Sequence, residues 1–366
     1  MTRVKENFNK SSYIIYFYVA YPYYFPHFIP ISQVFKRQGH QVVFVLSEKQ
    51  NTQNMEYIAK ENKLEYKFGE AFLFDKSVDA VFFGSPYEKA KKVNAITIFM
   101  DHGLGPKFPK SYIACIEYFD IYLTEGTQKY NQLKRLYPDL EYKVENVGFS
   151  KFDGVINLSD KERKTLLTRY GLNKNKKIIL YAPTFFPSSI ERMKDDFPKH
   201  FPNCSILVKP HYLSYERDKY RNQLEKFRKW ERYDNCIILP LEEYNIVPFL
   251  AISDIMISDE SSTMFEFASL NKPVISNQYF KLRWSYHLMP WRLSNRIDSS
   301  KARYRKMLDN AYNYEDTLRY VREALQNPKK LEGYRLNLSK ELSGENDGKV
   351  SERISKVVLD KINSLL

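Results

Sequence analysis

Short apolar runs alternate with longer mixed segments from the beginning of the chain. Residues 13–19 form the first run, residues 28–38 read as a helix, and residues 41–46 form the second run. Near-continuous apolar runs of this length are typical of strands buried in a parallel sheet, and helices usually connect them. Gly39 lies where the helix should stop. The beginning of the chain therefore predicts a strand, a helix and a parallel strand.

Two series of such runs follow, separated by a polar stretch. Turn residues at 148–154 and a charged helix over 160–170 mark the separation. The remaining predicted strands are 78–83, 95–100 and 121–123 in the first series, and 177–182, 205–208, 236–239, 254–257 and 273–275 in the second. Helical spacing predicts two further helices at 315–325 and 348–366.

This alternation predicts an α/β protein with two Rossmann-like domains that face a central cleft, with C-terminal helices. The expected boundaries are 1–150 for the N-terminal domain, 151–340 for the second domain and 341–366 for a C-terminal helix. A length of 366 residues suits two domains of ordinary size. Open α/β sheets bind ligands outside the carboxyl ends of their strands, so the chemistry is expected there.

Composition narrows the choice of partners without deciding it. A hydrophobic fraction of 43%, with 29 Tyr and 25 Phe, predicts a folded protein with aromatic packing. A formal net charge of +13 attracts anions, which include nucleotides, phosphorylated polymers, acidic lipid and nucleic acid. The cysteines Cys115, Cys204 and Cys236 are far apart and lack CxxC spacing, so we expect neither disulfides nor zinc, and a reducing cytoplasm.

One stretch, Tyr13 to Ile31, has the composition of a membrane segment. Pro22, Pro26 and Pro30 interrupt it, whereas a spanning helix needs about 20 continuous apolar residues. No small-residue cleavage site follows it, so a signal peptide is not expected. Any membrane contact of this chain is expected to be peripheral.

Residues 257–268 run from a predicted strand end through a polar turn into a predicted helix. Unpaired N–H groups at a helix start, together with the hydroxyls of Ser261 and Ser262, can hold an anion such as a diphosphate. The structural alternative is ordinary capping, because Thr263 and Glu266 have the spacing of a capping box. This segment alone does not decide between the two interpretations.

A cation and an imidazole follow a second strand of the same domain. Lys209 and His211 come directly after the predicted strand 205–208. Both side chains can complement phosphate, although a Lys-Pro-His sequence is also common in surface loops. Their position relative to Ser261 and Ser262 favours a shared phosphate site.

The first domain offers a histidine after the predicted strand 95–100. His102 lies in a loop that Gly103 and Gly105 open to substrate. Imidazole titrates near neutrality, so His102 can take a proton from a hydroxyl, with Asp101 or another carboxylate orienting it. The alternative is a loop histidine satisfied by hydrogen bonds. His27, after the first strand, is a second candidate at the expected cleft.

These pieces, in this order, resemble the CDP-glycerol glycerophosphotransferases of teichoic acid synthesis and related capsule polymerases, which have the GT-B fold. The matching pieces are His102-Gly103 with Lys107, Gly148 with Asp153, residues 179–184, Lys209 with His211, and Ser258 through Pro273. Three positions depart from the family's pattern. Asp101 replaces an aromatic residue, Tyr212 replaces a proline and Glu260 replaces a tyrosine.

The resemblance implies roles for particular residues. It makes His102 the base, His211, Ser261 and Ser262 contacts of the donor diphosphate, and Lys107 a substrate contact. The residues themselves add Asp101 beside the base and Lys209 at the diphosphate. The further expected substrate contacts are His27, Asp259 and Glu266. The first domain is then the acceptor side and the second binds the nucleotide donor.

The expected function is transfer of a glycerol- or ribitol-phosphate from a CDP-activated donor to a hydroxyl of a cell-surface glycan or lipid-linked acceptor. Three alternatives stay open: a GT-B glycosyltransferase that uses a CMP- or UDP-sugar, a sugar-nucleotide epimerase, and a noncatalytic binder of anionic polymer. No cofactor is required on this expectation, and a need for a divalent cation stays open. Nucleic acid is not an expected partner. The expected location is the cytoplasm, with peripheral contact to an anionic inner membrane surface.

Overall fold

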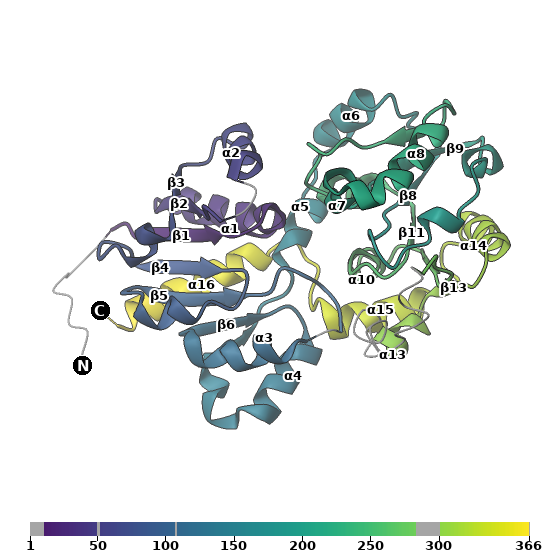
Figure 1. The fold of residues 1–366 in the computed structure, drawn as a ribbon. Helices are drawn as coiled ribbons and strands as arrows, with labels where there is room; N and C mark the ends of the chain where they lie inside the picture. Colours follow the sequence, from purple (N-terminus) through teal and green to yellow (C-terminus); the bar gives the residue numbers. More distant parts are fainter. Residues whose placement is uncertain (1–10, 50–51, 107, 283–300, 366) are drawn as a thin grey trace. The chain divides into compact units, whose positions relative to one another are not determined.

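The computed structural model describes residues 11–49, 52–106, 108–282 and 301–365, and the chain divides into two compact units (Figure 1). The first unit comprises Met1–His102, Phe108–Asn157 and Ser343–Leu366, and the second comprises Gly103–Lys107 and Leu158–Leu342. The boundary after Asn157 differs from the predicted boundary after residue 150. The C-terminal segment also differs from the prediction, because it belongs to the first unit.

A parallel sheet forms the centre of the first unit. Its strands are β1 (Ile14–Val19), β2 (Gln41–Leu46), β3 (Tyr66–Phe68), β4 (Ala80–Phe83), β5 (Ile96–Met100), β6 (Ile121–Thr124) and β7 (Val144–Asn146), in the order β3-β2-β1-β4-β5-β6-β7. Its helices are α1 (Phe25–Arg37), α2 (Thr52–Glu61), α3 (Lys110–Ala114), α4 (Thr127–Leu136), α5 (Asp153–Ile156) and α16 (Val350–Asn363).

The second unit repeats this architecture. Its parallel strands are β8 (Lys177–Tyr181), β9 (Cys204–Val208), β10 (Cys236–Ile238), β11 (Ile255–Ser258), β12 (Val274–Asn277) and β13 (Asp309–Ala311), in the order β10-β9-β8-β11-β12-β13. Its helices are α6 (Asp160–Arg169), α7 (Tyr212–Glu216), α8 (Arg221–Trp230), α9 (Val247–Ile252), α10 (Thr263–Ser269), α13 (Lys301–Arg305), α14 (Tyr314–Gln326) and α15 (Glu332–Leu342). Two parallel sheets confirm the predicted α/β class.

The order of the strands reverses direction once in each sheet. The reversal lies between β1 and β4 in the first unit and between β8 and β11 in the second. Open α/β sheets bind ligands beside the carboxyl ends of the strands at such a point. The loops that follow these strands are therefore where functional side chains should be sought.

The first helix begins earlier than the sequence predicts. The sequence predicts a helix over 28–38, which leaves Pro26 outside it, but α1 already starts at Phe25 and includes Pro26 and Pro30. Pro26 lies in the first turn, where a main-chain N–H has no partner within the helix, so its ring costs little. Pro30 forgoes one helical hydrogen bond, and burial of Phe25 and Phe28 on the same helix offsets that loss.

Aromatic side chains fill both cores. The ring of Phe17 stacks on Phe44 and Phe82, with centroids 5.3 and 4.6 Å apart. In the second unit, the Trp230 ring lies 5.5 Å from that of Phe197. All five side chains are almost completely buried. The high Tyr and Phe content of the sequence therefore serves packing, since each buried aromatic removes a large apolar area from water.

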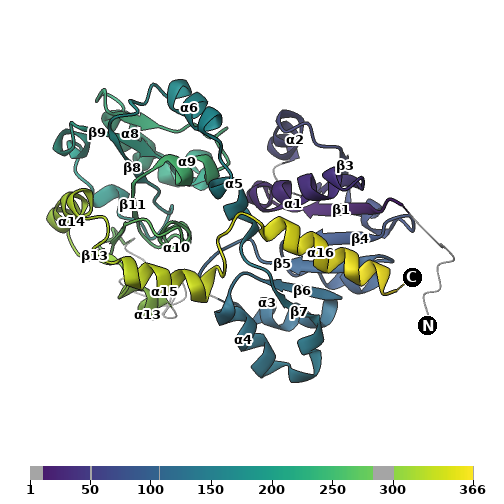
Figure 2. The ribbon, with the colours of Figure 1, turned by 180° about the vertical axis from the view of Figure 1, so that it is seen from behind.

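The C-terminal helix α16 lies across the first sheet and packs beside α1, as Figure 2 shows in yellow. Both carboxylate oxygens of Asp153 accept hydrogen bonds from its first turn, at 3.0 Å from the Val350 nitrogen and 2.6 Å from the Ser351 nitrogen. Gly148 (φ +101°) permits close packing, because a Cβ there would lie 2.9 Å from a methyl of Val350. Gly148 and Asp153, two of the matched family positions, thus attach the end of the chain to the first unit.

No helix in the described part of the chain has both the length and the apolar character that a membrane span requires.

Replacing Asp153 with alanine should destabilise the first unit, because two buried main-chain N–H groups of α16 would lose their acceptor. We expect the free energy of unfolding to fall by about 1–3 kcal/mol. Asp153→Asn should lose less, since asparagine can still accept one of these bonds. Chemical denaturation checks this, with Asp139→Ala at an exposed position as the matched control. Equal stability of Asp153→Ala and the control would contradict the anchoring role.

Candidate functional site

His102 follows β5, at the carboxyl edge of the first sheet. Its Nδ1 lies 2.8 Å from the main-chain oxygen of Gly84, which follows β4. A carbonyl oxygen can only accept a hydrogen bond, so Nδ1 carries the hydrogen and donates it. The neutral ring then holds its lone pair on Nε2. With 26% of its side chain exposed, His102 is set up to accept a proton at Nε2.

Aromatic rings pack around His102. The rings of Tyr23 and Tyr24 lie 4.8 and 5.1 Å from the imidazole. Gly84 allows the close approach of Tyr24, because a Cβ at Gly84 would lie 2.9 Å from that ring. The same glycine therefore supplies the oxygen that orients His102 and the space for the ring beside it.

Asp101 supports the main chain of His102 more closely than its ring. Its Oδ1 accepts a 2.7 Å hydrogen bond from the His102 nitrogen and lies 3.6 Å from Nδ1 of the ring. Its Oδ2 lies 2.7 Å from Nζ of Lys129, which is also 3.1 Å from Oε2 of Glu125. The predicted orientation of the ring by a carboxylate is thus replaced by orientation through the Gly84 carbonyl.

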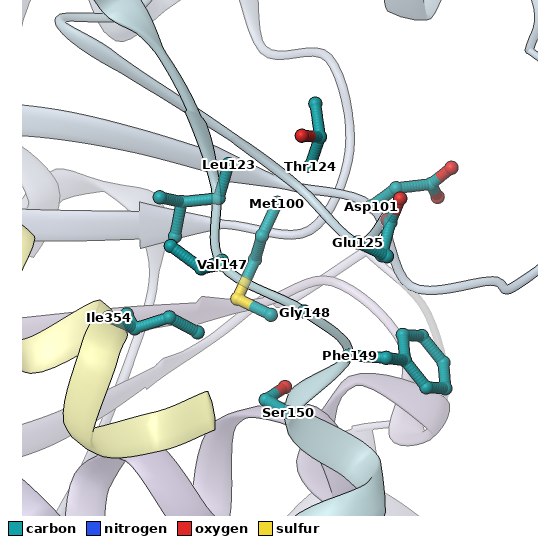
Figure 3. A pocket seen from close by; sticks show the side chains of 10 residues that line it. All are labelled: Met100, Asp101, Leu123, Thr124, Glu125, Val147, Gly148, Phe149, Ser150 and Ile354. Carbon is teal, nitrogen blue, oxygen red and sulfur yellow. The ribbon is translucent and has the colours of Figure 1, made fainter. Parts of the chain in front are cut away.

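A small pocket lies at the carboxyl ends of β5, β6 and β7 (Figure 3). Asp101 and Glu125 both line it, and the remaining lining residues are Met100, Leu123, Thr124, Val147, Gly148, Phe149, Ser150 and Ile354. In Figure 3 the two carboxylate side chains lie side by side. Acidic groups are thus held inside the sheet edge from which His102 emerges.

His27 lies on α1 with 2% of its surface exposed. Its ring packs edge-on against Phe149, with centroids 5.0 Å apart, and its Nδ1 has no hydrogen-bond partner among the described residues. Burial, with smaller contributions from Lys151 and His102, holds the pKa of His27 well below its usual range. His27 is therefore neutral and buried close to His102, which does not fit direct contact with substrate.

In the second unit, Lys209 and His211 follow β9, and Ser261 and Ser262 follow β11. Only β8 separates these two strands in the sheet. Neighbouring strands are about 4.8 Å apart, so the two strand ends lie about 10 Å from each other at one edge. The side chains that follow these two strand ends can therefore contact the same diphosphate.

His211 is held in the opposite tautomer from His102. Its Nδ1 accepts a hydrogen bond from the Leu213 nitrogen at 3.2 Å, so in the neutral ring Nε2 carries the hydrogen. Burial, and secondarily Lys209, lowers the pKa of His211 to about 4, and the ring is neutral at physiological pH. Phe185 and Tyr212 flank it at 4.7 and 4.6 Å. His211 can therefore donate a hydrogen bond to a phosphate oxygen.

The capping box that the spacing of Thr263 and Glu266 suggests does not start the helix after β11. Helix α10 begins at Thr263, and Ser262, the residue before it, makes no capping hydrogen bond with its side chain. Ser261 contacts Thr263 at 2.7 Å between the two hydroxyls, and Ser262 is exposed. Because α10 has only seven residues, its dipole is small, and side chains carry more of any phosphate binding than the sequence suggests.

Asp259 is fully buried and organises the loop after β8. Its carboxylate accepts hydrogen bonds from the Thr184 nitrogen (2.6 Å), the Ser188 hydroxyl (2.9 Å) and the Ser189 nitrogen (3.1 Å). Burial raises the pKa of Asp259 to about 7 against these bonds. The structure thus supports a positioning role for Asp259 in place of the expected substrate contact, because its carboxylate faces the protein interior.

The other expected contacts differ in their surroundings. Glu266 is 2% exposed within α10, which does not fit direct contact with substrate. Glu260, at the position where the family has tyrosine, forms an ion pair with Arg305 of α13. Lys107 lies outside the described residues.

Candidate metal ligands are not grouped together in the described residues. No cluster of three or more His, Cys, Asp or Glu side chains there could hold a metal ion. Cys115, Cys204 and Cys236 are free and buried. The candidate phosphate contacts in the described part of the second unit are a lysine, a neutral imidazole and hydroxyls.

The two doubly wound sheets are those of the GT-B class. A wall teichoic acid polymerase, TagF, has the same fold, with a TM-score of 0.66 at 16% identity over 96% of this chain and 89% of that one. A putative UDP-N-acetylglucosamine 2-epimerase from Listeria monocytogenes also shares it, with a TM-score of 0.68 at 10% identity over 97% and 98% of the two chains. At such identities these likenesses concern the fold alone.

The sequence itself identifies the family. Residues 116–360 match the family described as CDP-Glycerol:Poly(glycerophosphate) glycerophosphotransferase, and the chain belongs to it. The predicted resemblance is thereby confirmed.

Curated relatives match shorter segments. A teichoic acid poly(glycerol phosphate) polymerase from Bacillus spizizenii is 30% identical over 130 residues, which are 32% of this chain and 30% of the relative. A teichoic acid poly(ribitol-phosphate) polymerase from the same organism is 32% identical over 136 residues, 35% of this chain and 20% of that one. The matches thus span less than a third of the length of these relatives.

Three residues of the first unit's site carry no motif in the sequence: Gly84, Glu125 and Lys129. The spacing of Glu125 and Lys129, four residues apart at the start of a helix that follows a strand, is a signal that could reveal the pair. Gly84 gives no such signal, because it acts through its main-chain oxygen.

Proposed function

We propose that this chain transfers a polyol phosphate, of the glycerol- or ribitol-phosphate type, from a CDP-activated donor to a hydroxyl of a cell-surface glycan or lipid-linked acceptor. One observation carries the proposal: two histidines at family-matching positions are held in opposite tautomers. His102 presents a lone pair at Nε2, and His211 presents a hydrogen there. A base and a phosphate ligand are the two roles that this reaction requires.

The second unit provides the donor side in this proposal. Lys209 supplies positive charge, and His211 supplies a neutral hydrogen-bond donor from Nε2. Ser261 and Ser262 add hydroxyls from the end of β11, which is separated from β9 by β8. Asp259 acts behind them by holding Thr184 and the loop after β8. Donors fixed in advance around a leaving phosphate stabilise the charge that develops there, which is usually a large part of catalysis.

The chemical step is an attack on phosphorus. The acceptor oxygen forms a bond to the phosphorus that carries the polyol, and the bond from that phosphorus to the bridging oxygen breaks. CMP leaves with the bonding electrons, and the acceptor's proton goes to Nε2 of His102. The cation that forms on the ring is stabilised by the Gly84 oxygen at Nδ1 and by Asp101, 3.6 Å away.

A panel of donors tests this proposal. CDP-glycerol, CDP-ribitol, a CMP-sugar and a UDP-sugar are offered with a polyol-phosphate acceptor, and released nucleotide is measured by chromatography. We expect CMP from a CDP-polyol. His102→Asn should lower kcat by about 10²–10⁴-fold, because asparagine can still donate to the Gly84 oxygen but cannot act as a base. His200→Asn is the matched control. His200 lies in the second unit and belongs neither to the groups around His102 nor to the proposed phosphate contacts.

Three results would contradict the proposal. Consumption of nucleotide sugars alone would favour a glycosyltransferase, and conversion of a donor without acceptor would favour an epimerase. Anion binding that weakens with salt, with no nucleotide released from any donor, would favour a noncatalytic binder.

We further propose a cytoplasmic location with peripheral contact to an anionic membrane surface. The net charge of +13 supports this, as do exposed residues on and between α14 and α15. Exposed Arg322, Lys329 and Lys340 accompany the exposed side chains of Tyr334 and Leu336. Basic and aromatic groups together are typical of surfaces that bind acidic lipid. The aromatic segment in α1 does not contribute, because its Phe residues are buried.

Cosedimentation with vesicles tests this location. The protein should pellet with vesicles that contain phosphatidylglycerol at low salt and be released at high salt, because charge attraction is screened. Neutral phosphatidylcholine vesicles are the control. Failure to pellet with anionic vesicles at low salt would rule the membrane contact out.

A further inference from the structure

A buried trio of charged side chains stands behind His102. Asp101 ends β5, Glu125 follows β6, and Lys129 lies in the first turn of α4. The Lys129 ammonium bridges the two carboxylates, at 2.7 Å from Asp101 and 3.1 Å from Glu125. The three residues are only 8%, 4% and 4% exposed in the order Asp101, Glu125, Lys129. Charges this deep interact strongly, because little water screens them.

The members of the trio differ in how readily they change charge. Burial alone raises the pKa of Asp101, but Lys129 and His102 outweigh it and bring this pKa below its usual range. Burial acts to lower the pKa of Lys129, but both carboxylates outweigh it and raise this pKa. Burial, helped by Asp101 and opposed by Lys129, raises the pKa of Glu125 to about 7. Of the three, only Glu125 changes charge near neutral pH.

The ionisation of Glu125 therefore sets the net charge behind the base. With Glu125 protonated, the positive charge of Lys129 is balanced by Asp101 and the trio is neutral. With Glu125 ionised, Lys129 is shared between two carboxylates and the trio has one net negative charge. Asp101 is the member that meets His102, through the main-chain hydrogen bond and at 3.6 Å from the ring. The negative charge of Asp101 is then available to stabilise a cationic His102 ring.

Glu125 depends on Lys129 for this link. It lines the pocket of Figure 3, and both of its carboxylate oxygens are buried without a well-formed hydrogen bond in the described part of the chain. Lys129 approaches Glu125 to 3.1 Å as an ion pair. A carboxylate with so little other compensation is sensitive to the charge beside it.

We propose that Glu125 is a positioning residue of the transfer reaction, which acts through Lys129 and Asp101 to set how well His102 takes the acceptor's proton. This inference rests on the proposed function in one respect, the role of His102 as base. Glu125 itself does not touch the reacting atoms. Its ionisation should raise the basicity of His102, because a net negative charge favours the imidazolium.

Other titratable groups of the described residues lie around the trio. They are Tyr122 on β6, Tyr112 on α3, Cys115 after α3, His27 on α1 and Lys151 in the 3₁₀ turn Ser150–Phe152. Burial raises the pKa values of the two tyrosines and of the cysteine, and lowers that of His27. These four groups stay neutral near pH 7. A change in the charge of the trio near pH 7 is consequently assigned to Glu125.

The test compares wild-type protein with Glu125→Gln, which keeps the shape of the side chain and removes its charge. The ring signal of His102 is followed by NMR across pH 5 to 9 and assigned with His102→Asn. In Glu125→Gln we expect its titration midpoint to move to lower pH by up to about one unit. Glu145→Gln, an exposed carboxylate on the adjacent strand β7, is the matched control and should leave the midpoint unchanged.

Turnover should show the same link. In Glu125→Gln we expect kcat to fall by about ten-fold, with the KM for the donor unchanged, because the donor groups lie in the second unit. The increase of kcat between pH 6 and 8 should also be shallower than in wild type. A lower kcat/KM with an unchanged dependence of kcat on pH would indicate a merely structural role and overturn the proposal.

The two proposals can fail separately. If no CDP-polyol is consumed, the proposed function fails, while the NMR midpoint still decides whether Glu125 controls the charge at His102. If Glu125→Gln does not fold, the wild-type protein gives the answer. In its NMR spectra, the signals of the Glu125 carboxyl carbon and of the His102 ring should then change together near neutral pH. An unchanged midpoint in a folded variant, or the absence of that common change, overturns the inference.

Discussion

A single main-chain hydrogen bond decides what each of the two site histidines can do. The Gly84 oxygen accepts from Nδ1 of His102 and leaves Nε2 with a lone pair. The Leu213 nitrogen donates to Nδ1 of His211 and leaves Nε2 with a hydrogen. Two chemically identical side chains thereby become an acceptor and a donor. The proposed base and the proposed phosphate ligand both depend on this choice of tautomer.

Each histidine is supported by buried groups that never need to meet substrate. In the first unit, Asp101 holds the main chain of His102, and Lys129 and Glu125 lie behind Asp101. In the second unit, buried Asp259 performs the corresponding task for the loop after β8. Such support costs stability through the burial of charge and is kept where geometry must be fixed.

Much of this architecture could be predicted from the sequence. The longer strands are near-continuous apolar runs, so their number, direction and approximate ends follow from the pattern. The strands β3, β7 and β13 have three residues each and include polar side chains, too little for a pattern to register. The early start of α1 escapes prediction because Pro26 is tolerated in a first turn. The return of α16 to the first unit depends on a contact between Asp153 and Val350, almost two hundred residues apart.

The candidate site divides in the same way. His102, Lys209, His211, Ser261 and Ser262 follow predicted strand ends, and a motif marks each of them. Gly84 acts through its main chain and has no motif, and the trio around Lys129 is assembled by the fold. Burial is likewise invisible in the sequence, which is why Asp259 and Glu266 read as substrate contacts until their surroundings are known.

The tautomers of His102 and His211 can be measured by NMR. Long-range 1H–15N correlation spectra of the ¹⁵N-histidine-labelled protein distinguish a protonated from an unprotonated ring nitrogen. Near neutral pH, we expect the hydrogen of the neutral ring to be on Nδ1 in His102 and on Nε2 in His211. Finding the same tautomer in both rings, or the two assignments exchanged, would contradict it.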